Sequence, residues 1–265
     1  MADAVYEVFA VRYGHAPRQA SQNFLAGDPH DGPMPMDYFV WVARSTRHTV
    51  VVDTGFSPGE ARRRQRELLR PPVDGLALLG VDANAVKHVI LTHLHYDHAG
   101  NCDLFPNARF HVQDRELAYA TGRYMRHAPL REAYDVESVV GLVRLLYAER
   151  VVCCGDGDSV TPGITVHHIG GHTAGLQVVR VETAHGPVLL ASDASHYYAN
   201  FEQARPFPIV VDVGEMLEGY DRMRRLITEP GRIVPGHDPL VMERFPAPEA
   251  RLEGAVVRLD VGQRQ

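Results

Sequence analysis

The segment from Thr92 to Gly100 carries the densest group of metal-type ligands in the chain. It places His93, His95, Asp97 and His98 directly after an apolar run at 89–91. His93 and His95 are two residues apart, a spacing that one side of an extended chain presents together, whereas a helix face needs three or four. The motif therefore predicts a loop at the end of a strand. Burying four such groups without a metal would cost ~1–3 kcal/mol each, so we expect a metal site here.

Asp97 and His98 are adjacent and point apart, so they most simply serve a second ion or a different edge of the same one. Three further candidates follow predicted strands: His172 after 164–169, Asp193 after 188–192 and His237 after 233–236. A structural or surface role is the competing interpretation for His172 and His237, because the chain has 15 histidines. Imidazoles and carboxylates suit a pair of borderline divalent ions such as Zn²⁺, with Mn²⁺, Fe²⁺ or Co²⁺ as alternatives, better than Ca²⁺ or Mg²⁺.

The complete ordered set resembles the metallo-β-lactamase superfamily, from about Val50 to Phe245. The resemblance implies an α/β fold, an αββα four-layer sandwich of two mixed β-sheets with helices on both outer faces and the metals at one edge. It implies that one ion is held by His93, His95 and His172, and that the other is held by Asp97, His98 and His237. Asp193 would bridge the ions, and Asp53, in an Asp-Thr-Gly turn, would orient a ligand imidazole. The expected chemistry is hydrolysis by a metal-bridging hydroxide, with Asp97 and Asp193 in catalytic positions.

Residues 171–177 and 192–195 are similar to the N-acyl-homoserine lactonase branch. This resemblance implies that the protein opens a lactone ring. It makes N-acyl-homoserine lactone the first-choice substrate and quorum quenching the expected role. That branch has a tyrosine three residues after the bridging aspartate, where this chain has His196, followed by Tyr197 and Tyr198. We expect His196 or Tyr197 to donate to the substrate, with cleft packing as the alternative for both tyrosines. Tyr38 is a weaker candidate for the cavity wall.

Other lactones, esters or thioesters, of pyridoxolactone-like or glyoxalase II-like type, are the alternative substrates, and a non-catalytic metal-binding sensor is the alternative function. The short tail after His237 disfavours thioesters. Class B β-lactamases usually have a cysteine at the place of Asp193, which disfavours antibiotic hydrolysis. The three cysteines, Cys102, Cys153 and Cys154, form no disulfide pattern and are expected to be inert, with Cys102 as a thiolate ligand the less favoured interpretation.

The chain has 265 residues, 45% of them hydrophobic, which suits one domain over 1–265. A formal net charge of −6 argues against a nucleic-acid binder. Neither a signal-type start nor an apolar stretch of membrane-spanning length is present, so we expect a cytoplasmic protein that binds a small lactone or ester and no membrane.

The remaining segments predict the elements that position the ligands. Strands are expected within 5–12 and 37–53, separated by a loop over about 13–36 that covers the metal cleft, reaches a neighbouring subunit or merely packs on the surface. Its His15, His30, Asp28 and Asp31 are interpreted as solvated turn residues. Residues 59–70 predict a basic helix with a solvated face. A helical insertion over about 114–150 would shape the pocket, fill the core or form a homodimer face.

Overall fold

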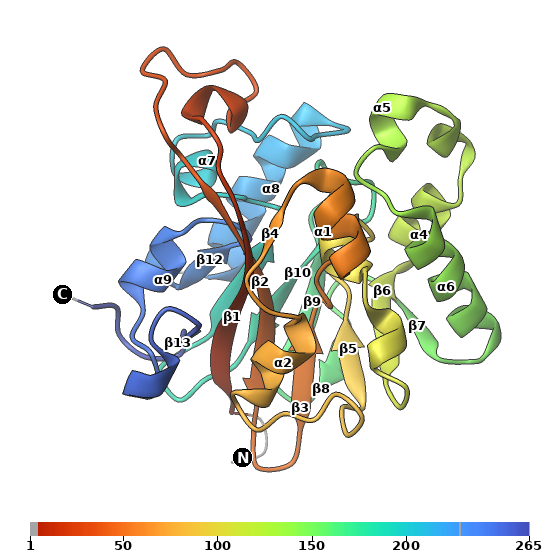
Figure 1. The fold of residues 1–265 in the computed structure, drawn as a ribbon, viewed down its shortest axis with the longest axis vertical. Helices are drawn as coiled ribbons and strands as arrows, with labels where there is room; N and C mark the ends of the chain where they lie inside the picture. The colour runs from red at the N-terminus through yellow and green to blue at the C-terminus, as the bar shows by residue number, and fades with distance from the viewer. Residues whose placement is uncertain (1–4, 228, 265) are drawn as a thin grey trace.

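A computed structural model describes residues 5–227 and 229–264, and two mixed β-sheets form its centre (Figure 1). The larger sheet has the order β13-β1-β2-β3-β5-β6-β7, with β4 paired to β1. Its strands are β1 (Glu7–Ala16), β2 (Met36–Arg44), β3 (Thr49–Val52), β4 (Glu67–Leu68), β5 (His88–Ile90), β6 (Arg109–Gln113), β7 (Val151–Cys154) and β13 (Val256–Arg258). Neighbours from β13 to β3 are antiparallel, and those from β3 to β7 are parallel.

The smaller sheet has the order β12-β11-β10-β9-β8. Its strands are β8 (Ser159–Thr161), β9 (Ile164–His168), β10 (Gln177–Val181), β11 (Val188–Ser192) and β12 (Ile233–Pro235). Only β11 and β12 are parallel within it. Parallel pairing brings the carboxyl ends of β11 and β12 to the same edge, and it does the same for β3 and β5 in the other sheet.

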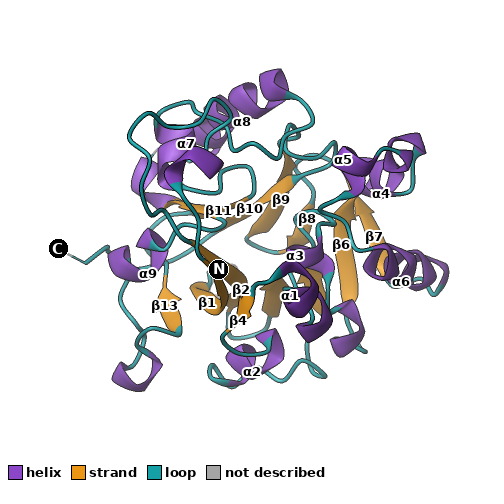
Figure 2. Ribbon diagram, turned by 45° about the horizontal axis from the view of Figure 1, so that its top comes forward, coloured by secondary structure: helices purple, strands orange, loops and turns teal. Residues whose placement is uncertain are grey.

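Helices cover both outer faces (Figure 2). The α-helices are α1 (Pro58–Arg64), α2 (Pro72–Ala77), α3 (Tyr96–Ala99), α4 (Asp114–Ala120), α5 (Ala128–Arg131), α6 (Val136–Tyr147), α7 (Tyr198–Glu202), α8 (Val213–Leu226) and α9 (Leu240–Arg244). Single 3₁₀ turns are η2 (Ala20–Gln22), η3 (Cys102–Leu104), η4 (Arg123–Arg126), η5 (Pro230–Arg232) and η6 (Ala250–Leu252). Within the described residues, no helix has both the length and the apolar character of a membrane span.

Side chains along β2 point alternately to the two faces of the larger sheet, and this alternation explains the layers of the fold. Phe39 and Trp41 belong to the core that also contains the strands of the smaller sheet, whereas Tyr38 and Val40 point to a second core beneath α1, α2 and α6. The far side of the smaller sheet is covered by α8, whose Met216 and two later apolar residues are buried. These layers confirm the predicted αββα sandwich.

Two predicted boundaries are wrong. Strand β1 continues to Ala16 because residues 14–16 pair with β2, so the connecting loop is 17–35, and His15 is a strand residue that contacts Asp37 rather than a turn residue. The basic helix ends at Arg64 instead of Arg70, because Gln65 adopts a left-handed conformation (φ 54°) and the chain then pairs with β1 as β4. The helical character of residues 114–147 is confirmed by α4, α5 and α6.

Candidate metal centre

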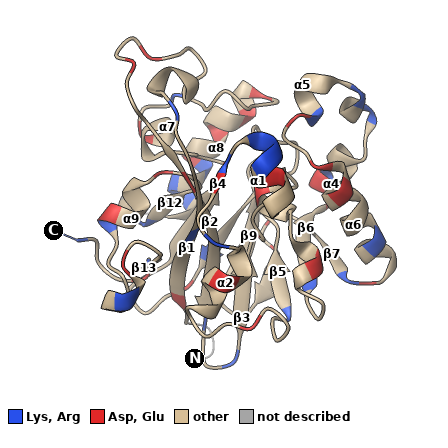
Figure 3. Ribbon diagram, in the orientation of Figure 1, with Lys and Arg blue, Asp and Glu red and all other residues tan. Residues whose placement is uncertain are grey.

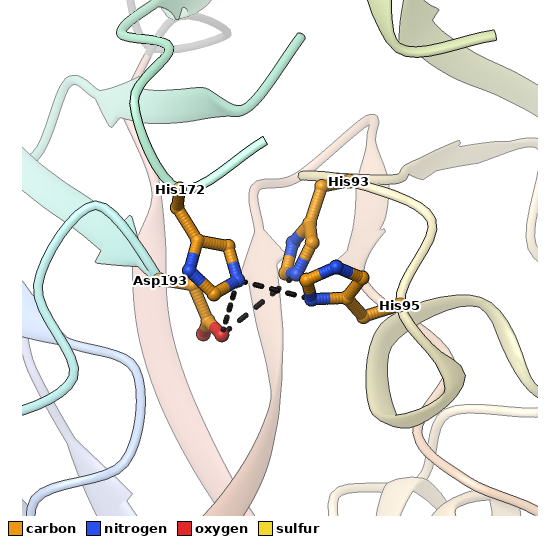
Figure 4. A group of neighbouring side chains, drawn as sticks. All are labelled: His93, His95, His172 and Asp193. Atoms are coloured by element: carbon orange, nitrogen blue, oxygen red, sulfur yellow. Dashed lines mark hydrogen bonds and ion pairs between the residues drawn. The ribbon is translucent and has the colours of Figure 1, made fainter. Parts of the chain in front are cut away.

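All seven predicted ligands come together at one edge of the two sheets, and none is more than 7% exposed. They come from loops that follow β5, β9, β11 and β12, with Asp97 and His98 inside the short helix α3. Their potential ligand atoms form two groups, each within 4.8 Å: His93, His95, His172 and Asp193 in one, and Asp97, His98 and His237 in the other. A third group of the same size joins Asp193 and His237 to His196, which was not predicted as a ligand. Figure 4 shows the first group, in which four side chains point toward one another.

Each of three imidazoles is fixed by a hydrogen bond at its outer nitrogen. His172 Nδ1 lies 2.7 Å from the Ile209 carbonyl, His237 Nδ1 lies 2.9 Å from the Asp37 carbonyl, and His98 Nδ1 lies 2.7 Å from Asp53 Oδ2. A carbonyl or carboxylate can only accept, so Nδ1 of each ring carries a proton and Nε2 is the nitrogen that faces the centre. This arrangement of outer partners is typical of histidines that bind metal.

The carboxylate of Asp193 lies between the two groups and offers one oxygen to each. Its Oδ2 lies 3.2 Å from His172 Nε2 and 3.7 Å from His93 Nε2. Its Oδ1 lies 2.9 Å from His237 Nε2 and 3.3 Å from His98 Nε2. The loops after β11 and β12 approach closely here, since a Cβ on Gly236 would lie 2.9 Å from Asp193 Oδ1. This is the geometry of a carboxylate that could join two ions.

The chemistry of the buried donor atoms fits divalent ions. His93 Nε2, His98 Nε2 and Asp193 Oδ1 are buried without a hydrogen-bond partner in the described residues, and such orphans are rare unless an ion or water satisfies them. His95 Nδ1 and His172 Nε2 face each other at 3.0 Å. Burial lowers the pKa of His93 and of His95 well below the ordinary value, which keeps both rings neutral as metal ligation requires.

The contact predicted for Asp53 is confirmed. Besides accepting from His98, its carboxylate accepts from the Thr92 amide and the Thr92 hydroxyl, both at 2.8 Å. Thr92 immediately precedes His93. One buried carboxylate therefore holds both the start of the ligand loop and one of its imidazoles.

A second buried carboxylate, Glu116 on α4, was missed by the sequence analysis. Its Oε1 accepts from the Leu94 amide (3.0 Å) and the Tyr134 hydroxyl (3.1 Å), and its Oε2 accepts from the Thr173 hydroxyl (2.6 Å) and the Gly175 amide (3.1 Å). Leu94 lies between His93 and His95, and Thr173 follows His172. Glu116 thus ties two ligand loops together, and no local pattern distinguishes it from a surface glutamate of an amphipathic helix.

The residues after Asp193 take different positions. His196 Nε2 lies 3.0 Å from Asp193 Oδ2, and the His196 ring stacks on Phe207 with centroids 3.6 Å apart. Tyr197 and Tyr198 are buried, Tyr197 near Phe207 and Tyr198 beneath Arg244, whose guanidinium lies 3.8 Å from the ring. Of these three residues, only His196 lines the cavity that opens over the ligands.

That cavity has a volume of about 170 Å³. Besides four of the ligand residues, its walls contain Tyr38, Tyr96, Phe207, Ile209, Met36, Pro129 and three arginines. Tyr38 packs edge-on against His237, with ring centroids 5.1 Å apart. The loop between β1 and β2 reaches this cavity through Arg18, while its tip projects beyond α7 in Figure 1.

Among the described residues, the cysteines belong to neither ligand group. Cys102 is buried, and burial raises the pKa of its thiol to about 12, so it stays protonated. Its Sγ approaches Thr54 Oγ1 at 4.0 Å rather than a ligand. Cys154 is buried and Cys153 is exposed.

Comparison with known proteins independently supports a metal-dependent hydrolase. A model of the metallo-β-lactamase superfamily matches residues 34–237. An N-acyl homoserine lactonase of a Bacillus species is 33% identical over 168 residues, covering 63% of this chain and 61% of the relative. A probable metallo-hydrolase of Mycobacterium bovis is 30% identical over 215 residues, covering 71% and 66%. The matched part of this chain thus spans about 61% of the length of the first relatives.

Solved structures share the fold. A quorum-quenching N-acyl homoserine lactone hydrolase superimposes with a TM-score of 0.76 at 24% identity, covering 91% of this chain and 96% of the other. The dizinc quorum-quenching lactonase AidC superimposes with a TM-score of 0.70 at 14% identity and covers 100% of both chains. At these identities the likeness establishes the architecture, an α/β fold with two mixed sheets.

Proposed function

The chain belongs to the metallo-β-lactamase superfamily and has the ligand groups of a metal-dependent hydrolase; from this premise we propose that the bond it hydrolyses is the ester of a lactone. The relatives named as lactonases support the proposal at about 30% identity. The observation that carries it is the position of Asp193, with one oxygen toward each set of imidazoles.

We assign His93, His95 and His172 to one ion and Asp97, His98 and His237 to the other, with Asp193 between them. Zn²⁺ is the favoured ion, and Mn²⁺, Fe²⁺ and Co²⁺ accept the same ligands. A pair of divalent ions, when bound, supplies a hydroxide nucleophile at neutral pH and polarises the carbonyl that it attacks.

The protein's own groups orient the substrate. His196 is at the cavity wall, and its Nε2 faces Asp193 Oδ2 at 3.0 Å. We assign to this Nε2–H, once Asp193 binds the ions, the hydrogen bond to the substrate carbonyl or to the departing alkoxide, in preference to Tyr197. The hydroxyl groups of Tyr38 and Tyr96 lie 3.4 Å apart in the same wall and are further donors within the cavity. Burial raises the pKa of Tyr38 to about 12, so its phenol keeps its proton at neutral pH.

The test combines metal content with ring opening. Purified protein is loaded with Zn²⁺, its metal is counted by mass spectrometry, and acid release from N-acyl homoserine lactones, simple lactones and phenyl esters is followed in a pH-stat. We expect about two ions per chain and turnover of lactones. Asp193→Ala should lose metal and activity together, whereas Asp156→Ala, which removes an exposed carboxylate that contacts Arg222 on the surface, should change neither.

The outcomes separate the alternative functions. If the protein hydrolyses esters or thioesters but no lactone, the proposed substrate class is wrong, although the chain would remain a hydrolase. Two bound ions with no turnover of any substrate would contradict hydrolysis and favour a metal-binding sensor.

A further inference from the structure

The cavity over the ligands has an arginine-rich wall. Arg18, Arg64 and Arg66 all line it, in a chain whose net charge is −6. They come from two separate segments, the loop after β1 and the end of α1 with the turn that follows. Figure 3 shows the positive charge gathered at the end of α1. The sequence predicts a solvated helix face for this arginine run, and for Arg64 and Arg66 that prediction is wrong, since both are half-buried in the cavity wall.

Two of the three guanidinium groups have no carboxylate partner among the described residues. Arg66 makes one side-chain hydrogen bond, from Nε to the Tyr96 hydroxyl at 3.3 Å. Arg18 donates to Asn23 Oδ1 and to the Gln22 carbonyl, both of them neutral acceptors. Half-buried cations are usually paired, because desolvation is costly and water screens them less. Arg18 and Arg66 are therefore positive charges available to something that enters the cavity.

Three carboxylates line the same cavity, and among the described residues none of them forms an ion pair with Arg18 or Arg66. Arg64 is paired with Glu60, but the same carboxylate also binds Arg63. Glu132 is exposed at the rim, and only its backbone carbonyl is bound to Arg64. Asp97 and Asp193 lie at the floor, within the ligand groups.

Arg18 and Arg66 each contact an aromatic side chain of the cavity wall. Arg66 Nε lies 3.3 Å from the hydroxyl of Tyr96, which stands within the ligand loop. The Arg18 guanidinium lies 5.1 Å from the centroid of the Phe207 ring, on which the His196 ring stacks. The two cations therefore line the same cavity as the ligand groups, where they could bind one end of a molecule whose other end reaches the cavity floor.

The cavity volume limits the size of that molecule. Pockets for drug-sized ligands usually measure roughly 300–1,000 Å³, whereas this cavity measures about 170 Å³. It suits a single ring with a compact substituent better than a ring with a long acyl chain.

We propose that the substrate is a small lactone that carries a carboxylate, and that Arg18 and Arg66 bind this group while the ring lies over the ligand groups. The proposal rests on the proposed lactone hydrolysis and specifies its substrate class. Guanidinium groups suit the task because their planar N–H groups match a carboxylate in paired hydrogen bonds. A neutral N-acyl homoserine lactone would leave both cations without a counter-charge.

The kinetic test compares two substrates of equal size, 5-oxotetrahydrofuran-2-carboxylate and its primary carboxamide. Wild type should have at least a tenfold higher kcat/KM for the carboxylate, mostly through KM, and added salt should reduce the preference because charged contacts are screened. Arg66→Gln and Arg18→Gln should each lower the carboxylate-to-carboxamide ratio by about tenfold. Arg62→Gln, at an exposed position of α1 outside the cavity wall, should keep the wild-type ratio.

A binding measurement gives a readout that does not need turnover. Calorimetric titration of the Zn²⁺-loaded protein with pyroglutamate, the lactam counterpart, should show at least tenfold tighter binding than with pyroglutamamide. Both arginine variants should lose this difference, with Zn²⁺ content unchanged. Retention of the difference in both variants would place the carboxylate on the ions and overturn the proposal.

The two proposals fail in different ways. Turnover of the neutral lactone at an equal or higher rate would overturn the anionic substrate and leave lactone hydrolysis standing. Arginine-dependent binding of pyroglutamate without turnover of any lactone would contradict lactone hydrolysis and leave the anion-binding wall standing.

Discussion

Glu116 and Thr173 share the shortest hydrogen bond that holds the ligand loops together. The Thr173 hydroxyl donates to Glu116 Oε2 at 2.6 Å, deep in the protein, one residue after His172. The other oxygen of the same carboxylate accepts from the Leu94 amide between His93 and His95. The relative position of three proposed ligands thus depends on a residue that belongs to neither ligand group and whose two oxygens each accept two hydrogen bonds.

Replacement of this carboxylate should destabilise the protein strongly. Glu116→Ala leaves four buried donors without an acceptor, at a cost of about 1–3 kcal/mol for each group. We expect the melting temperature to fall by at least about 5 °C in calorimetry. Glu116→Gln keeps one acceptor oxygen and should lose less, so an equal loss in both variants would contradict the assigned role.

Asp53 should control the affinity of one ion more than the fold. Asp53→Asn keeps the size of the side chain but removes the charge that faces His98 Nδ1. Loss of such an outer partner typically weakens metal binding by about 10–100-fold. Competition with a chromophoric chelator should show one weakened site of two, and two unaffected sites would disprove the positioning role.

His196 and Tyr197 can be separated by matched substitutions. His196→Phe removes a group at the cavity wall and should lower kcat by about 10²-fold, the lower end expected for loss of a proton donor. Tyr197→Phe removes a hydroxyl outside that wall and should leave kcat within about threefold. Metal content must be measured in parallel, since loss of an ion from His196→Phe would make His196 a ligand.

Two glycines should respond in opposite directions to the same change. A Cβ on Gly175 would lie 2.0 Å from the Glu116 backbone nitrogen, so Gly175→Ala must push α4 away from the His172 loop and lower both stability and metal content. Gly141 lies within α6 with nothing near its virtual Cβ. Gly141→Ala should therefore stabilise by about 0.5–1 kcal/mol in urea unfolding.

The ligand motifs and the fold could be predicted from the sequence because their signals are local. Alternating apolar residues mark the strands, and a histidine or aspartate directly after a strand is placed at the sheet edge by the backbone alone. The contact between Asp53 and an imidazole of the ligand loop was implied by the resemblance to the superfamily, and Asp53 Oδ2 lies 2.7 Å from His98 Nδ1.

Only the tertiary structure decided which distant groups complete the site. The carbonyls of Asp37 and Ile209 select the tautomers of His237 and His172, and no side-chain pattern encodes a backbone acceptor. The helix of residues 59–70 was predicted too long, because its end depends on the pairing of β4 with β1. That pairing turns Arg66 into the cavity near Arg18, across 48 residues of sequence. The sequence by itself predicted a metal site, because four of the proposed ligands lie within residues 93–98. Packing between segments decided which distant groups join them and which charges line the cavity, and with these the proposed substrate.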